Sequence, residues 1–250
     1  MSSVLVVDIG NTNLTFGYFR GERVARRSRL ATAPLPSAAM LRETLGRYSK
    51  AERVIFASVV PKADSRFRAA VRAVFGFSPA QLTPRSKLGI RLRVDSPGEV
   101  GADRLANALA AYRKVNGPAI VLDFGTATTF DCVNSNGDYI GGAILPGPKV
   151  ASQALALKAA KLPEIPIRPT RRVIGKNTVE CLQAGIYYGY LGMIDRVLAE
   201  TMHEFRSKKK PKVIITGGLG KLFVGAMKSK AVYYPDLTLD GIRLAGTLIC

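Results

Sequence analysis

The stretch VLVVDIGNTNLTFGYF, residues 4–19, decides how this chain folds. An apolar strand ends in a turn of mainly small and polar residues, Asp8 to Asn13, and a second β-rich run begins at once. Gly10 permits backbone angles that other residues resist. As structure alone this is a hairpin turn. As chemistry it is a carboxylate beside backbone N–H groups and short side-chain donors, which suits a phosphate and its metal ion. One hairpin leaves both interpretations open.

The same pattern returns in the second half of the chain. VLDFGTATTFDCV, residues 121–133, can be laid on VVDIGNTNLTFGY, residues 6–18, without a gap. Asp123 then falls on Asp8, Gly125 on Gly10 and Thr126 on Asn11. Third strands are expected at residues 24–30 and 139–144. Because two facing Asp-x-Gly turns can grip the phosphates of one nucleotide, the repeat predicts a duplicated nucleotide-binding fold, with its seam at residues 116–118.

The remaining elements follow from periodicity and capping signals. Ser96 to Glu99 has the spacing of a capping box, which predicts a helical segment that continues past a bend at Gly101. VIITGGLGK, residues 213–221, is a strand ending in Gly217-Gly218, where bare backbone can lie against an adenine or ribose. GGLGKL does not have the spacing of a P-loop. Further helices are expected at 37–49 with Ser37 as N-cap, 62–75, 150–160 and 178–204, and further strands at 53–58 and 213–216.

Composition bounds the class of protein. The chain has 250 residues, of which 47% are hydrophobic, and its apolar runs are short and strand-like, so no membrane span is expected. No secretory signal is expected from the first residues either. Its three cysteines, Cys132, Cys181 and Cys250, form no C-x-x-C pair. They argue against a disulfide framework or a zinc site and fit a reducing cytoplasm.

The formal net charge of +19 is unusual. It is gathered in clusters at residues 20–29, 85–93, 168–176 and 206–212. Such a field attracts anionic ligands, and nucleic acid nonspecifically. The clusters have neither the interleaved aromatic residues of a single-strand platform nor a base-reading helix signature. Specific nucleic-acid binding is therefore not expected, and solvated basic faces are the favoured explanation.

With these motifs in place, the chain resembles the type III pantothenate kinases over nearly its whole length. The resemblance implies an α/β fold of the actin-like ATPase (ribonuclease H-like) type, with two lobes, residues 1–116 and 117–250. Each lobe would hold a mixed sheet that starts in a three-strand meander and is flanked by helices. It also implies ATP-dependent phosphorylation of pantothenate to 4′-phosphopantothenate, the first step of coenzyme A synthesis, by a cytoplasmic homodimer. The motifs that carry it are DIGNTN, EVGADRLANALAAY, VLDFGTATTFD, YIGGAILPG, IGKNTVECLQAGIYYGYLGMID, VIITGGL and PDLTLDGIRL.

The resemblance also implies residue roles. Thr126 would contact ATP, and Asp123 would bind a monovalent cation, K⁺ or NH₄⁺. Asp103 would be the general base, and Thr178 would touch pantothenate. The first phosphate loop would be Asp8, Ile9, Gly10, Asn11, Thr12, Asn13, Leu14 and Thr15, with Asp8 near Mg²⁺. Pantothenate would be held by Gly101, Ala102, Asp103 and Arg104. Many family members have a Tyr where this chain has Val94, so the pocket wall differs here.

Plainer interpretations stay open at several positions. Asp103 and Arg104 can be a solvated pair on a helix, Asp123 can cap a turn, and Thr178 is a good N-cap. His203, the sole histidine, sits near a predicted helix end, where an interaction with the helix dipole is the simpler account. The stripe GIYYGYLGMID indicates close helix packing, in the core or between subunits. Two other functions also stay open: a kinase of this fold for another hydroxylated substrate, and a regulatory or nucleic-acid-binding protein built on a decayed kinase.

Overall fold

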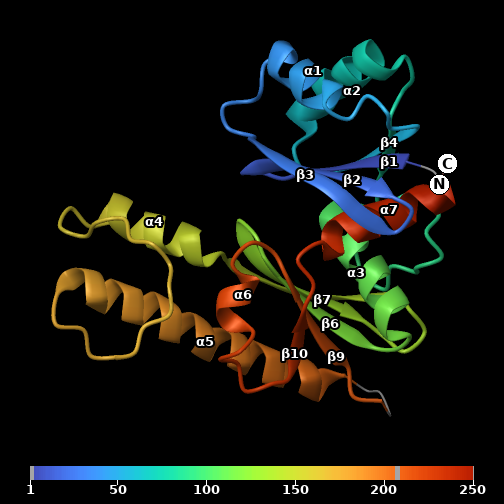
Figure 1. Ribbon diagram of the computed structural model, residues 1–250. Helices are drawn as coiled ribbons and strands as arrows, with labels where there is room; N and C mark the ends of the chain where they lie inside the picture. The colour runs from blue at the N-terminus through green and yellow to red at the C-terminus, as the bar shows by residue number, and fades with distance from the viewer. Residues whose placement is uncertain (1–2, 206–208, 250) are drawn as a thin grey trace. The chain divides into compact units, whose positions relative to one another are not determined.

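The computed structural model describes residues 3–205 and 209–249, which form two compact units. Unit 1 contains residues 1–113 and 237–250, and unit 2 contains residues 114–236 (Figure 1). Part of the basic cluster at 206–212, and Cys250, lie outside the described residues. Cys132 and Cys181 are both free thiols.

Unit 1 is built on a five-stranded mixed sheet. Its strands are β1 (Ser3–Ile9), β2 (Asn13–Arg20), β3 (Arg23–Ala31), β4 (Arg53–Ser58) and β5 (Ala80–Leu82), in the order β3-β2-β1-β4-β5. The first three form the predicted antiparallel meander, and β4 runs parallel to β1. Helices α1 (Ala38–Gly46) and α2 (Pro61–Phe75) cover one face, where alternate apolar residues of β1, β2 and β4 make the core. Ser37 caps α1 as predicted, since its side chain accepts from the Met40 N–H.

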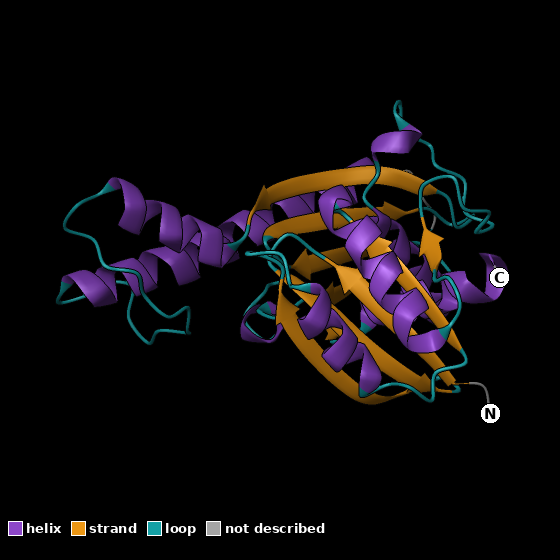
Figure 2. Cartoon of the chain, turned by 90° about the horizontal axis from the view of Figure 1, so that it is seen from above, coloured by secondary structure: helices purple, strands orange, loops and turns teal. Residues whose placement is uncertain are grey.

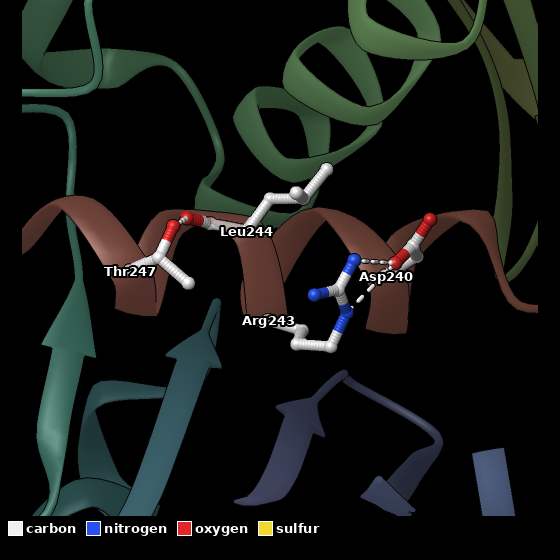
Figure 3. A network of polar contacts seen from close by, with 4 residues as sticks. All are labelled: Asp240, Arg243, Leu244 and Thr247. Carbon is white, nitrogen blue, oxygen red and sulfur yellow. Dashed lines mark hydrogen bonds and ion pairs between the residues drawn. The ribbon is translucent and has the colours of Figure 1, made fainter. Parts of the chain in front are cut away.

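Two further helices complete unit 1. They are α3 (Ala102–Val115) and the C-terminal α7 (Leu237–Ile249), which packs against β1, β4 and β5. A glycine allows α7 to approach α3 closely, because a Cβ at Gly241 would lie 2.0 Å from the carbonyl oxygen of Ala106 in α3. Figure 3 shows α7 between a neighbouring helix and the strands of the sheet, where Arg243 and Asp240 form a largely buried ion pair at 2.7 Å. The expectation that residues 237–250 belong to the second lobe is therefore corrected, since contacts distant in sequence place this helix in unit 1.

Unit 2 repeats this architecture. Its strands are β6 (Ala119–Phe124), β7 (Ala127–Val133), β8 (Tyr139–Pro146), β9 (Lys212–Thr216) and β10 (Ala231–Tyr233), in the order β10-β9-β6-β7-β8. β6, β7 and β8 form an antiparallel meander, and β9 runs parallel to β6, as β4 does to β1. The long α5 (Thr178–Glu204) and the short α6 (Gly220–Phe223) pack on one face around Phe124, Phe130 and Phe223. Helix α4 (Pro148–Lys158) lies along α5, and Figure 2 shows both helices extending beyond the sheet of this unit.

The two central hairpins do not match without a gap. Asp8 pairs with Thr15, whereas Asp123 pairs with Thr129, one position closer. The turns close through equivalent hydrogen bonds, from the Gly10 N–H to the Asn13 oxygen and from the Gly125 N–H to the Ala127 oxygen, both 3.0 Å. The first turn therefore contains one additional residue. Thr126 corresponds to Thr12 rather than to Asn11, which corrects the gapless superposition.

Helix ends differ from the sequence expectation at two places. Pro97–Glu99 forms only a 3₁₀ turn, without a side-chain cap from Ser96, and α3 begins separately at Ala102. The N-cap of α5 is Asn177 rather than Thr178, because the Asn177 side chain accepts from the Glu180 N–H at 3.0 Å. The three-residue strands β5 and β10 were not predicted, since so short a run carries no readable period.

Candidate active site

The first phosphate loop connects β1 to β2 in unit 1. Asp8 lies near the carboxyl end of β1, and residues 10–13 form the turn that follows. Gly10 has no left-handed backbone angle, so its predicted conformational role is not used here. Thr32, directly after β3, holds the loop with two hydrogen bonds. Its hydroxyl donates to the Gly10 carbonyl at 2.7 Å, and its N–H donates to the Thr12 carbonyl at 2.9 Å.

The second loop connects β6 to β7 in unit 2. Its Thr126 carbonyl accepts a hydrogen bond from the Gly147 N–H at 3.0 Å. A Cβ at Gly147 would lie 2.4 Å from that same oxygen and 2.6 Å from the Gly125 oxygen, so this position has no room for a side chain. Gly217, with φ +82°, packs equally closely against the β6 end of this loop. A Cβ at Gly217 would lie 2.5 Å from Asp123 Oδ1. The structure thus brings Asp123, Thr126 and the Gly217-Gly218 turn together within unit 2.

A cavity of about 450 Å³ adjoins this group in unit 2. Two of its lining residues lie near this group in sequence: Lys149 is the second residue of α4, two residues after Gly147, and Leu219 follows Gly217-Gly218. Most of the lining is apolar, with one residue of each charge. The lining residues are Lys149, Glu164, Ile165, Pro166, Ile167 and Leu219. Sequence reasoning missed the contribution of residues 164–167, since a segment without regular structure carries no periodic signal.

Asp103 is the second residue of α3 in unit 1. Its carboxylate accepts a hydrogen bond from the Arg104 N–H at 2.8 Å, and Leu105 closes the first helical turn onto the Gly101 carbonyl at 3.1 Å. A Cβ at Gly101 would lie 2.4 Å from Asp103 Oδ1, so the glycine leaves space for this carboxylate position. Burial raises the pKa of Asp103, and the Arg104 N–H and guanidinium oppose that rise. Asp103 is therefore a desolvated carboxylate rather than a fully solvated surface charge.

Thr178 is the first residue of α5 in unit 2, and it is exposed. A reciprocal capping arrangement surrounds it, because Glu180 accepts from the Lys176 N–H at 2.8 Å while Asn177 caps the helix. The Lys176 N–H is the main reason why the pKa of Glu180 is lowered. The Thr178 hydroxyl is thus not needed for capping. His203 lies exposed in the last turn of α5, where the helix-dipole interpretation placed it.

Within the described residues, His, Cys, Asp and Glu nowhere gather in a group of three or more that could hold a metal ion. Mg²⁺ in kinases is bound through one or two carboxylates, substrate phosphates and water, so single carboxylates such as Asp8 fit that ion. None of the helices within residues 3–205 and 209–249 combines the length and apolarity that a membrane crossing requires.

The class of protein follows from similarity of fold. The chain resembles a ROK family glucokinase from Streptomyces griseus, solved with glucose and AMPPNP, with a TM-score of 0.57. The alignment covers 96% of this chain and 98% of that one at 12% identity, which shows the fold alone. Together with the two repeated five-stranded sheets, this confirms the predicted actin-like, sugar-kinase type of α/β fold.

Sequence similarity then gives the family. The family model described as type III pantothenate kinase matches residues 4–200. A type III pantothenate kinase from Geobacter sulfurreducens is 40% identical, over 96% of this chain and 97% of its own length. Another from Geotalea uraniireducens is 41% identical, over 96% of each chain. The chain belongs to the type III pantothenate kinase family, and the expectation of a phosphotransferase is confirmed.

Proposed function

We propose that this protein transfers the γ-phosphoryl group of ATP to the hydroxyl of pantothenate, giving 4′-phosphopantothenate, with Asp103 as general base. Family membership supports the reaction. The observation that carries the residue assignment is the repeat of one loop construction at equivalent positions of two sheets. Asp8 and Asp123 occupy matching places in it, each two residues before the glycine of its turn.

The two loops are suited to phosphate. Phosphoryl transfer passes through a loose transition state, so catalysis depends on positioning and on charge neutralisation. Backbone N–H groups of the two turns, such as those of Asn11 and Thr126, would supply fixed donors. Asp8 would help to hold Mg²⁺, which when bound would neutralise phosphate charge. Asp123 would hold the monovalent cation, K⁺ or NH₄⁺, because it places a carboxylate among backbone turns rich in oxygen.

The cavity beside the second loop supports a place for the nucleoside of ATP. Ligand cavities are usually mostly apolar with a few polar groups, and this one has that composition. Its volume of about 450 Å³ lies in the range of small-molecule sites. Since Leu219, the residue after Gly217-Gly218, lines it, the end of the adenosine segment expected from the sequence adjoins a space of suitable size.

Residues 101–104 would hold pantothenate. Arg104 offers a planar guanidinium fork, which pairs well with the carboxylate of that substrate or with a phosphate oxygen. Asp103 orients the substrate hydroxyl and accepts its proton late in the transfer. Thr178 would contact pantothenate through its hydroxyl, which the helix cap does not require. Val94, only partly exposed, replaces a tyrosine hydroxyl that many relatives have and makes the substrate wall less polar.

A cytoplasmic homodimer is the proposed assembly. Large apolar side chains stand exposed on β8, α4 and the segment that leads to α5, all in unit 2. Leu157 is 82% exposed and Ile174 is 76% exposed, and exposed apolar side chains that form a contiguous patch mark an interaction surface. A second copy of the chain is the occupant expected for this surface. The described arginines and lysines are explained by solvation and by attraction of anionic substrates, without specific nucleic-acid binding.

The deciding experiment is a product assay. Purified protein is incubated with ATP, Mg²⁺, K⁺ and pantothenate, and 4′-phosphopantothenate is measured by mass spectrometry. Omission of K⁺ or of Mg²⁺ tests each cation separately. Product from a different alcohol, but none from pantothenate, would favour a kinase for another substrate. Absence of any phosphorylated product, together with tight salt-sensitive DNA binding, would favour a decayed kinase.

Asp103→Asn tests the general base. Loss of a general base costs roughly 10²- to 10⁴-fold in rate, so kcat should fall by that factor while the KM for ATP changes little. Steady-state kinetics with both substrates measure this. An Asn variant with wild-type turnover would remove Asp103 from the proposed role.

The raised pKa of Asp103 also makes a prediction about stability. Burial favours the protonated form, so the folded protein binds this proton more tightly than the unfolded chain does. The cost of the buried carboxylate is absent below the ordinary Asp pKa of about 4 and is incurred as pH rises through the raised pKa. Asp103→Asn should therefore be increasingly stabilising, relative to wild type, as pH rises from about 4 to neutral. Urea unfolding at several pH values measures the difference in unfolding free energy between Asp103→Asn and wild type. A difference that does not change with pH would contradict a raised pKa at Asp103.

A further inference from the structure

Thr32 is a buried polar residue that the proposed catalytic roles do not include. It is 3% exposed and follows β3 directly. Its hydroxyl and its N–H donate to two carbonyls of the first phosphate loop, those of Gly10 and Thr12, at 2.7 and 2.9 Å. One residue outside the loop thus binds the loop at two points.

These two hydrogen bonds determine the direction of the loop's peptide groups. In a trans peptide the C=O of one residue and the N–H of the next point in opposite directions. Because the Gly10 and Thr12 carbonyls are turned toward Thr32, the N–H groups of Asn11 and Asn13 point away from it. On the side of the loop that faces away from Thr32, the two N–H groups are therefore presented and the two carbonyl oxygens are absent. This orientation attracts an anion and would be reversed by rotation of either peptide.

We infer that Thr32 is a positioning residue for the phosphates of the nucleotide: it fixes the first loop with its N–H groups directed at the anion. This inference rests on the proposed function, because it takes residues 8–15 to be the phosphate loop. The Thr32 hydroxyl orients the Gly10 peptide group, which the Thr32 N–H does not contact, because only the side chain reaches the Gly10 carbonyl. Preorganised donors stabilise developing charge without reorganising during the reaction. Loss of the hydroxyl should therefore weaken nucleotide binding in a protein that still folds.

The test compares Thr32→Val, which keeps the side-chain shape, with Thr32→Ser, which keeps the hydroxyl. The matched control is Thr44→Val, because Thr44 is a buried threonine of α1 in the same unit. We expect Thr32→Val to raise the Kd for MgADP, by calorimetry, and the KM for ATP about 5- to 50-fold, the range that loss of one buried hydrogen bond produces. The KM for pantothenate should change less, by roughly under threefold, because the two hydrogen bonds of Thr32 go to the phosphate loop and not to residues 101–104. Thr32→Ser should restore wild-type values, and Thr44→Val should not alter them.

A second measurement is independent of nucleotide and of activity. Amide hydrogen exchange of residues 10–13, in the full chain without ligand, should be faster in Thr32→Val than in wild type or Thr44→Val. If Thr32→Val lowers Tm but leaves both the MgADP Kd and the loop exchange unchanged, the residue is only structural and the inference is overturned. If Thr32→Val does not fold, Thr32→Ala takes its place in both measurements.

Failure of the proposed function would look different. A wild-type protein that binds no MgADP and phosphorylates no pantothenate would refute the phosphate loop itself, whatever Thr32 does to exchange. Wild-type binding and turnover, combined with a wild-type Kd in the hydroxyl-free variant, would refute Thr32 alone.

Discussion

The two Asp-x-Gly loops are built alike, but they are held in different ways. In each unit the residue directly after the third strand donates its N–H to a threonine carbonyl of the loop. Thr32 donates to Thr12 at 2.9 Å in unit 1, and Gly147 donates to Thr126 at 3.0 Å in unit 2. Beyond this shared bond, the first loop is fixed by the Thr32 hydroxyl, whereas the second is fixed by backbone packed against a glycine.

Loop length explains this difference. The first turn has one additional residue, which leaves space for a side chain after β3, and the Thr32 hydroxyl uses that space to reach Gly10. The second turn is shorter, and the chain after β8 lies so close that a Cβ would meet two carbonyl oxygens. The duplicated fold therefore kept the backbone bond and changed the contact around it. A side chain is therefore accommodated at Thr32, beside the first loop. No side chain should be accommodated at Gly147, beside the second loop.

Among changes to the two loops and their supports, Gly147→Ala should have the largest effect. Gly147 has φ −69°, an angle that alanine adopts freely, so any loss must come from the clash of the new Cβ with the Thr126 and Gly125 oxygens. Overpacking costs about 1–3 kcal/mol of stability. Displacement of the loop by about 1 Å should lower kcat/KM for ATP roughly 100-fold. Urea unfolding and steady-state kinetics measure the two effects.

Gly225→Ala is the matched control in unit 2. A Cβ at Gly225 meets nothing within 4 Å, and this glycine is not among those with positive φ. Its kinetics and stability should stay close to those of wild type. Similar behaviour of the two variants would mean that close packing does not fix the second loop, and the contrast between the loops would fail.

Much of the fold could be predicted from sequence, because the long elements carry a clear period. The predicted helix at 178–204 and strand at 53–58 have the observed bounds. The Asp-x-Gly repeat indicated the duplication, and the two sheet orders confirm it. The assignment of α7 to unit 1 could not be predicted, since it depends on contacts of Gly241 and Gly246 with residues far away in sequence.

The candidate site was predictable in its motifs but not in its supports. Asp8, Asp123 and Asp103 belong to recognisable strings, so sequence pointed to them directly. Thr32 belongs to no such motif, and Gly147 ends the string YIGGAILPG without any sign of its role there. In both cases the role is a hydrogen bond to a loop more than 15 residues away in sequence. The additional residue in the first turn was also hidden, since both strings align without a gap and only the strand register reveals it.

The smallest effect is expected for the glycines of the motif themselves. A Cβ at Gly125 would lie 3.5 Å from the Ala127 oxygen, an ordinary contact, and one at Gly10 would lie 3.3 Å from the Asn13 oxygen, slightly tighter. Neither glycine has a positive φ. Gly125→Ala should therefore leave stability unchanged or raise it by up to about 1 kcal/mol, because alanine restricts the unfolded chain. Gly10→Ala should be less favourable by a few tenths of a kcal/mol, roughly the cost of a slight shift.

Measuring nucleotide binding tests whether Gly10 and Gly125 are needed for the approach of a phosphate rather than for folding. If a phosphate approaches the loop backbone closely, a new methyl group obstructs it although the free protein accommodates it. Both variants should then show a KM for ATP raised several-fold at nearly wild-type Tm, about the cost of a small steric shift. An unchanged KM in both would mean that the glycines of the Asp-x-Gly turns serve neither folding nor ligand approach. In that case the contacts made by Thr32 and Gly147 would alone distinguish the two loops.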